Sequence, residues 1–240
     1  MTLFEWKAPG PYRVAFSSRL GGVSEGPFAS LNLGVLTDDD PDNVRKNRRR
    51  LCGKLGVDPE TATMAWQHHS ADVVRADGRG IVTPGIEFER CDGLWTEQPG
   101  RGLMLLSADC LPVALARTNG DPAVAVLHVG WRGLLAGIVE SGAAALAGEP
   151  FVAAIGPGIG PCCYEVGDEV AGPFRERFGD EVVSGRHLDL HEAAERALRE
   201  AGAESVERVG LCTSCEEELF FSNRRDRGRT GRQGILAVIR

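Results

Sequence analysis

Long apolar runs are absent from this sequence of 240 residues. A helix that crosses a bilayer needs roughly 20 consecutive apolar residues, so we expect no membrane partner. The first residues, MTLFEWKAPGPYR, carry a glutamate and two prolines and lack the apolar core of an export signal. The cytoplasm is therefore the expected location.

Basic residues are also in short supply: 27 lysines and arginines against 34 acidic residues give a net charge of −7. A general nucleic-acid binder needs a basic surface, so we expect no nucleic-acid partner. Seven cysteines are too few for a disulfide scaffold of this length, and their odd number predicts free thiols in a reducing compartment. These thiols and the five histidines are the soft metal ligands of the chain.

Repeats, low-complexity tracts and linkers are missing too, so residues 1–240 are expected to form a single domain. Apolar runs and helical patterns interleave without a strict strand–helix–strand rhythm, which favours an α/β fold, a layered sandwich with mixed sheets. The expected strands lie at residues 12–18, 63–67, 72–76, 102–106, 112–116, 123–129, 151–156, 205–211 and 234–239. The expected helices lie at residues 41–55, 133–147, 167–178 and 189–201.

The first expected helix has clear boundaries, with Asp40 as N-cap, Pro41 at the first helical position and Gly56 at its end. Its apolar residues share one inner face. Its five central basic residues are expected to form a solvated face without a functional role: Arg45, Lys46, Arg48, Arg49 and Arg50.

Three strand ends carry a histidine or a cysteine next to a turn: WQHHS at 66–70, SADCLP at 107–112 and LHVGWRG at 127–133. Two imidazoles and a thiolate form a three-ligand set for zinc that leaves a fourth position open for water or substrate. Zinc prefers these nitrogen and sulfur donors, whereas magnesium and calcium prefer oxygen. The ligand separations of 41 and 18 residues match no short zinc motif, so ordinary buried histidines and cysteine remain the alternative.

Other metal-ligand patterns are weaker. CTSC at 212–215 has the CxxC spacing but no second such pair, so we expect no closed four-cysteine site. The vicinal pair Cys162–Cys163 does not fit the zinc-deaminase pattern of PCxxC with an upstream HxE. In HLDLH, Asp189 is the expected N-cap of a helix, which leaves the first histidine outside that helix and separates it from the second.

Eight blocks resemble, in order and in rough spacing, the YfiH/laccase-domain family: FSSRLGGVSEGPFASLNLG, WQHHS, CDGLWT, SADCLPV, HVGWRG, AIGPGIGPCCYEVG, HLDL and CTSCEEELFFSNRRDRGRTGR. The resemblance runs from about residue 13 to the C-terminus and implies a single compact α/β domain. Members of this family were long labelled multicopper polyphenol oxidases and are now described as zinc-dependent purine nucleoside phosphorylases. The implied partners are a purine nucleoside and inorganic phosphate.

The resemblance also implies the ligands of a zinc ion: His69, Cys110 and His128. Family members have a hydrophobic residue at the position of His68. Because neighbouring side chains on a strand point to opposite faces, we assign His69 rather than His68 to the metal. Zinc at this site would act as a Lewis acid or hold an activated water.

The implied reaction is phosphorolysis of adenosine, inosine, guanosine or methylthioadenosine, with adenosine deamination as a side activity. We take Cys110, His128 and Asp109 as the catalytic residues. Asp109 would orient a ligand or a substrate hydroxyl, or carry a proton, with turn capping as its alternative role. Guanidinium groups bind phosphate oxygens bidentately, so Arg19 and Arg132, which stand in family blocks, are the expected phosphate ligands.

Three questions stay open at this point. A copper-dependent polyphenol oxidase would hold copper in place of zinc, although laccase chemistry needs more histidines than the five in this chain. A hydrolase would use Cys110 as nucleophile and His128 as base. The arginines of the C-terminal block either form a solvated loop or face the substrate: Arg224, Arg225, Arg227, Arg229 and Arg232.

Overall fold

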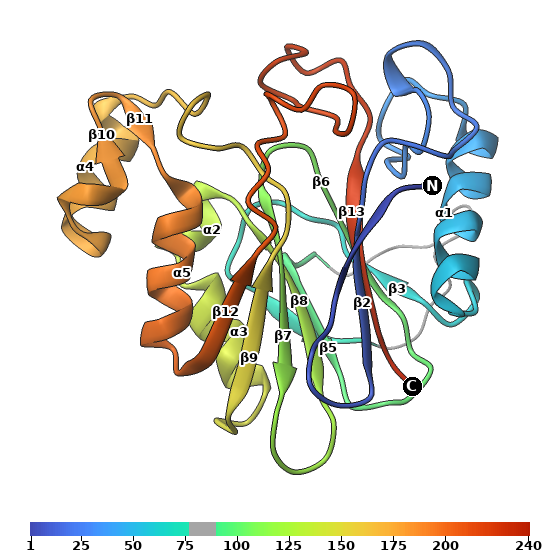
Figure 1. Ribbon diagram of the computed structural model, residues 1–240, viewed down its shortest axis with the longest axis horizontal. Coiled ribbons are helices and arrows are strands. Elements are labelled where there is room, and N and C mark those ends of the chain that lie inside the picture. The colour runs from blue at the N-terminus through green and yellow to red at the C-terminus, as the bar shows by residue number, and fades with distance from the viewer. Residues whose placement is uncertain (77–89) are drawn as a thin grey trace.

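Two β-sheets are stacked face to face, with helices on both outer faces, in the computed structural model, which describes residues 1–76 and 90–240 (Figure 1). The five-stranded sheet has the order β1 (Leu3–Trp6), β2 (Tyr12–Ser17), β13 (Gln233–Ile239), β6 (Leu103–Ser107) and β3 (Thr63–Met64). The six-stranded sheet has the order β12 (Ala203–Arg208), β9 (Phe151–Ile155), β7 (Leu111–Arg117), β8 (Val124–Val129), β5 (Gly93–Thr96) and β4 (Val73–Arg75). Both sheets contain parallel and antiparallel pairs, which confirms the predicted sandwich with mixed sheets.

The helices form the two outer layers (Figure 1). One side is covered by α1 (Pro41–Leu55), and the other by α2 (Trp131–Leu135), α3 (Ile138–Ala145), α4 (Asp168–Phe178) and α5 (Leu190–Glu200). A small sheet of β10 (Val183–Ser184) and β11 (His187–Leu188) lies beside α4, and short 3-10 turns occupy Gly26–Phe28 and Asp180–Val182. Among the described residues, no helix is long and apolar enough to cross a membrane.

Three apolar cores fill the spaces between the layers, because side chains alternate between the two faces of each central strand. On β7, Val113 and Leu115 join the core beneath α2–α5, whereas Ala114 and Ala116 join the core between the two sheets. A third core lies between the five-stranded sheet and α1. Every residue of β7 and β8 is buried, so packing on both faces fixes the ends of these two strands.

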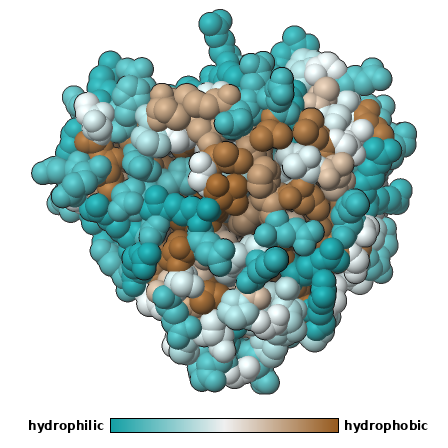
Figure 2. All heavy atoms as spheres, in the orientation of Figure 1, coloured by the Kyte–Doolittle hydropathy of each residue, from teal (hydrophilic) through white to brown (hydrophobic). Residues whose placement is uncertain are grey.

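The edges of the two sheets meet on the face seen in Figure 1. Apolar atoms gather near the middle of this face, inside a more polar margin (Figure 2). A groove there is lined by residues of both sheets, among them Phe4 and Phe16 of one sheet and Ala154 of the other. Trp6 Nε1 donates a hydrogen bond to the Glu207 carboxylate at 3.1 Å, which ties edge strand β1 to edge strand β12.

The boundaries of α1 are confirmed, since the Asp40 side chain accepts a hydrogen bond from the Asp42 amide and Gly56 ends the helix with φ of 69°. Two other expectations are wrong. Arg48 does not lie on a solvated face: it is buried, and its Nε donates to the Leu33 carbonyl at 2.9 Å. The helix expected at 133–147 is two helices, α2 and α3, because Gly137 adopts φ of 92° between them. Strands β1 and β5 were not expected at all.

Candidate functional site

His69, Cys110 and His128 converge at one end of the six-stranded sheet. Cys110 directly precedes β7, and the antiparallel register of β7 with β8 pairs Pro112 with His128, so these two candidate ligands come from adjacent strand ends. His69 arrives from the segment between β3 and β4 with a φ of 65°. One ligand atom from each residue lies within 4.8 Å of the other two.

Gly130 leaves room for this convergence. A side chain there would place its Cβ 2.9 Å from the Cys110 sulfur and 3.0 Å from Cδ2 of His69. Both contacts are shorter than normal van der Waals separations, so the turn after β8 requires glycine. The turn also begins α2, which starts at Trp131.

Asp92 positions the histidines from behind, although no sequence pattern pointed to this residue. Its carboxylate is fully buried and accepts hydrogen bonds from Nδ1 of His128 at 2.8 Å, from the His69 amide at 2.9 Å and from the Ser70 amide at 2.7 Å. Burial raises the pKa of Asp92, but the hydrogen bonds from His128 and Ser70 outweigh it and hold this pKa well below its usual range. With Nδ1 occupied, Nε2 of His128 is the nitrogen left for a metal, an arrangement common at protein metal sites.

Charge within the cluster suits a cation. Burial acts to raise the pKa of the Cys110 thiol, but His128 and His69 overcome this effect and lower it. Burial acts to lower the pKa of His128, but the Cys110 thiolate and the Asp92 carboxylate outweigh burial, so this pKa is raised. A thiolate between two imidazoles is a donor set that fits zinc or copper. The residues present therefore fit the metal that the sequence predicts at this position.

The other histidines do not join this cluster. His68 turns away, with Nδ1 3.3 Å from the Asp92 carboxylate and Nε2 3.9 Å from that of Asp72. His187 is exposed on β11, and His191 is buried in α5. The described part of the chain thus brings together two histidines and one cysteine, and it leaves the neighbouring His68 outside.

A cavity of about 450 Å³ opens onto the three ligands, a size typical of small-molecule sites. One part of its wall is apolar and includes Met64 and the unusually exposed side chains of Leu36, at 72%, and Trp66, at 46%. Another part is cationic and consists of Arg48, Arg224 and Arg232. The sequence left the roles of Arg224 and Arg232 open and assigned Arg48 to solvent, because their meeting depends on contacts between distant segments.

Arg19 and Arg132, the expected phosphate ligands, are not among the described residues that line this cavity. Nε of Arg19 donates to the Ala29 carbonyl at 2.7 Å, and its guanidinium stacks on the Phe221 ring. Arg132 is exposed and lies over the Trp131 ring, 4.2 Å from its centroid. Arg132 nevertheless comes two residues after Gly130, which packs against Cys110 and His69.

Asp109 lies in the cavity wall with a φ of 94°. Its Oδ1 accepts a hydrogen bond from Oγ1 of Thr213 at 2.7 Å, and its Oδ2 accepts one from the Arg224 amide at 2.6 Å. Its carbonyl accepts a third hydrogen bond, from the Ile159 amide at 2.8 Å. Because protein donors hold both carboxylate oxygens, the geometry favours a positioning role for Asp109 over proton transfer.

The reason for expecting no closed four-cysteine site does not hold, because the CxxC pair has a second cysteine pair beside it. Cys162, Cys163, Cys212 and Cys215 place their sulfur atoms within 4.8 Å of one another. A search for a second CxxC motif missed this cluster, because the partner of the CxxC pair is the vicinal pair in another loop. The two loops meet where Gly158 forms a parallel bridge with Cys212.

Comparison with known proteins identifies the family. Residues 13–240 match the family described as multi-copper polyphenol oxidoreductase laccase. A purine nucleoside phosphorylase of Pseudomonas aeruginosa is 38% identical over 98% of this chain and 96% of its own length. The purine nucleoside phosphorylase YlmD of Geobacillus stearothermophilus is 39% identical over 94% of this chain and 89% of its own.

Solved structures agree with this match. The crystal structure of YlmD from Geobacillus stearothermophilus superposes with a TM-score of 0.91 at 35% identity, and the match covers 100% of this chain and 97% of that one. The hypothetical protein YfiH of Bacillus licheniformis gives a TM-score of 0.90 at 33% identity over 95% of this chain and 93% of that one. Sequence and fold together show that this chain belongs to the YfiH-like family of multi-copper polyphenol oxidoreductase laccase domains.

Proposed function

We propose that the protein is a zinc-dependent purine nucleoside phosphorylase that splits adenosine, inosine, guanosine or methylthioadenosine with inorganic phosphate. The observation that carries this proposal is the cavity in which His69, Cys110 and His128 share a wall with arginines and exposed apolar side chains. The name purine nucleoside phosphorylase, which the similar proteins carry, supports the same reaction.

The apolar wall suits a purine base. Val35, Leu36 and Trp66 are exposed and line the same cavity, and exposed apolar side chains gathered in one place mark a binding groove. An indole offers a flat face on which a planar base can stack. We therefore assign the base to Trp66 and Leu36, and the ribose and phosphate to the polar end of the cavity.

The cationic wall suits phosphate, because guanidinium groups bind its oxygens through paired hydrogen bonds. Arg224 and Arg232 both line the cavity, and each uses one NH1 nitrogen to bind backbone carbonyls. These anchors orient the two side chains, so we assign phosphate to Arg224 and Arg232 ahead of Arg19. Arg132 is retained as a second candidate because it comes two residues after Gly130, which packs against Cys110 and His69.

In phosphorolysis, a phosphate oxygen forms a bond to C1′ of the ribose while the bond from C1′ to the purine nitrogen breaks, and its electron pair leaves with the base. Arg224 and Arg232 would hold the attacking phosphate, and Asp109 keeps the backbone of Arg224 in place. Burial and the Cys110 thiolate raise the pKa of Tyr164, so its hydroxyl stays protonated and can donate a hydrogen bond inside the cavity. His69, Cys110 and His128 would hold zinc, which supplies Lewis acidity near neutral pH.

Adenosine deamination is a second candidate activity. Three protein ligands leave one position of a tetrahedral zinc site for water, which is the arrangement of hydrolytic zinc enzymes. Deamination needs no phosphate and therefore does not require the arginines of the cavity.

Product analysis with purified protein tests the proposal. We expect adenosine or inosine to give free base and ribose 1-phosphate only when phosphate is present. The activity should require one zinc ion at the Cys110 site. It should be lost in Cys110→Ala and kept in Cys52→Ala, which removes a buried thiol in α1.

The other outcomes identify the competing activities. If the product is deaminated nucleoside without any free base, the activity is deamination and not phosphorolysis. If the protein binds copper and turns over phenols, it is an oxidase and not a phosphorylase. If metal-free protein cleaves the nucleoside and thiol alkylation abolishes this cleavage, the protein is a hydrolase that uses Cys110 and His128.

A further inference from the structure

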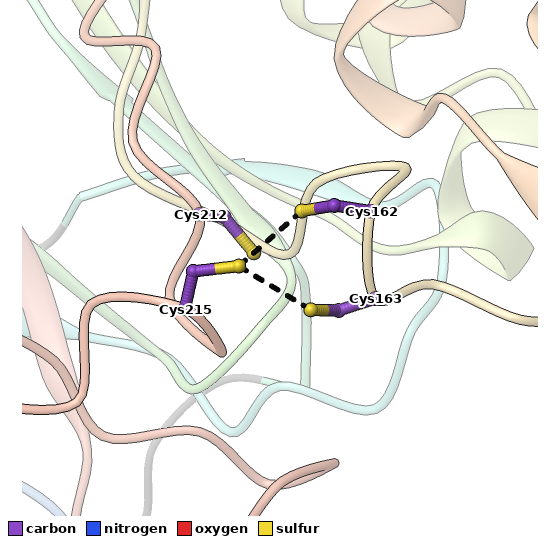
Figure 3. Close-up of side chains that lie close together, drawn as sticks. All are labelled: Cys162, Cys163, Cys212 and Cys215. Atoms are coloured by element: carbon purple, nitrogen blue, oxygen red, sulfur yellow. Dashed lines mark hydrogen bonds between the residues drawn. The ribbon is translucent and has the colours of Figure 1, made fainter.

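A second cluster of metal-ligating side chains lies outside the cavity. We propose that Cys162, Cys163, Cys212 and Cys215 bind a structural zinc ion, separate from the metal held by the histidines. Figure 3 shows the four side chains pointing toward a common centre from two loops. The Cys215 sulfur is 3.4 Å from that of Cys162 and 3.5 Å from that of Cys163.

The sulfur separations fit one tetrahedral ion. Zinc–sulfur bonds of about 2.3 Å place two thiolates of a tetrahedral site about 3.8 Å apart. The observed separations of 3.4 and 3.5 Å are close to that value, and all four sulfur atoms lie within 4.8 Å of one another. An iron–sulfur cluster contains several irons and sulfides between its cysteines and holds the thiolates farther apart than a single ion does. Among single ions, zinc binds such a site more tightly than ferrous iron.

The backbone shapes the site around the sulfur atoms. The Thr213 amide donates to the Gly158 carbonyl at 3.0 Å and joins the two loops. The Gly160 amide donates to the Cys212 sulfur at 3.2 Å, a contact that stabilises a thiolate. A side chain at Gly160 would put its Cβ 3.3 Å from both Sγ of Cys162 and Cβ of Cys212, so the loop has little space for one.

Arg225 holds the turn between the two cysteines of the CxxC pair. Its NH1 donates to the Thr213 carbonyl at 2.9 Å and reaches the Ser214 carbonyl at 3.5 Å, both between the two cysteines of the CxxC pair. The Asp226 carboxylate accepts hydrogen bonds from Nε and NH2 of the same guanidinium, so Arg225 orders this turn and its charge is balanced by Asp226. The four cysteines close all four coordination positions with protein ligands, as in structural zinc sites.

The ion would fasten two loops that build the wall of the cavity. Tyr164 directly follows Cys163 and lines the cavity. Thr213, between Cys212 and Cys215, donates from Oγ1 to the Asp109 carboxylate, which also accepts from the Arg224 amide. The ion is therefore expected to support the cavity without touching the substrate.

Metal analysis of the full chain tests this site independently of any nucleoside activity. We expect two zinc ions per chain in the wild type, one in Cys215→Ser, one in Cys110→Ala and none in the double variant. Cys52→Ala, which removes a buried thiol from α1, should keep both ions. A wild type with one zinc that Cys110→Ala removes and Cys215→Ser retains would overturn the proposal, as would iron or copper at the Cys215-dependent site.

Cobalt substitution of the wild type covers the case in which Cys215→Ser does not fold. Thiolate-to-cobalt charge-transfer absorption rises with the number of thiolates, so a four-thiolate site should give a band several times stronger than the single Cys110 thiolate. Cys163→Ser, which alters a partly buried ligand, should weaken that band. Absorption no stronger than one thiolate can give, or a disulfide between these cysteines in protein purified without reductant, would contradict the assignment.

Discussion

The two ligand clusters of this protein differ in what holds them. Cys110 and His128 stand at the ends of buried strands, and the paired register of β7 and β8 fixes their separation. Cys162 and Cys215 are exposed and belong to two loops. The sheet and the Asp92 carboxylate position the first cluster in advance, whereas the loops of the second depend on one another and on what their sulfur atoms bind.

This difference matches the chemistry of each cluster. Three ligands beside a cavity leave room for a water or a substrate, and a reactive site needs ligands that stay in place while the reaction proceeds. Four thiolates leave no open position, so an ion there contributes to folding. We call His69, Cys110 and His128 the strand-end cluster, and Cys162, Cys163, Cys212 and Cys215 the loop cluster. The comparison predicts that substitutions in the strand-end cluster lower activity at nearly constant stability. Substitutions in the loop cluster should lower stability first.

Cys110→Ala should have the largest effect on activity. It removes a metal ligand from a site that the sheet keeps in shape, so phosphorolysis should fall by more than the roughly 100-fold that loss of an outer partner costs. Unfolding followed by circular dichroism should show a midpoint close to that of the wild type. A collapse of stability together with activity would show that the strand-end cluster is not positioned in advance.

Asp92→Asn should come next. The amide keeps the size of the carboxylate but loses the charge that orients Nδ1 of His128 and accepts from the His69 and Ser70 amides. Changes to such outer partners typically cost about 10- to 100-fold in metal affinity or activity. Asp72→Asn is the matched control, because Asp72 is exposed and only approaches His68 at 3.9 Å. If the two substitutions have equal effects, Asp92 does not position the histidines.

The convergence of the strand-end cluster of His69, Cys110 and His128 could be predicted from the sequence, whereas the carboxylate behind it could not. An apolar run that ends in histidine or cysteine before a turn is a local pattern that singled out His128 and Cys110, and the family resemblance then selected them, with His69, as expected metal ligands. Asp92 acts only because β5 pairs with β8, with Gly93 opposite Leu127, and this pairing joins segments far apart in the chain.

The four-cysteine cluster was missed for a related reason. Its two pairs follow β9 and β12, which are parallel neighbours, so the loops after them leave the same edge of the sheet. The sequence does not show that those two strands are neighbours in the sheet, although each cysteine pair follows a predicted strand. The same dependence on distant contacts explains why Arg48, on a helix with many basic residues, proved to be buried.

Arg224→Lys separates the cavity arginines from those outside it. Lysine keeps the charge but loses the planar paired contact with phosphate, and a charge-assisted hydrogen bond is worth about 1.5–3 kcal/mol. Phosphorolysis should fall about tenfold, mainly through the KM for phosphate. Arg132→Lys should change it less than about twofold, because Arg132 is exposed outside the cavity. If Arg132→Lys lowers phosphorolysis more than Arg224→Lys does, Arg132 binds the phosphate.

Thr213→Val should have the smallest effect, and it tests whether the two clusters are connected. Valine has nearly the shape of threonine but cannot donate to the Asp109 carboxylate, so one buried acceptor loses its partner at a cost of about 1–3 kcal/mol in stability. Because the Asp109 carboxylate also holds the Arg224 amide, kcat/KM should fall by about fivefold or less, with the zinc content unchanged at both clusters. Ser214→Ala, which alters the neighbouring CxxC residue, serves as the control. If Thr213→Val lowers stability while kcat/KM stays at the wild-type value, the loop cluster supports the fold without supporting the cavity.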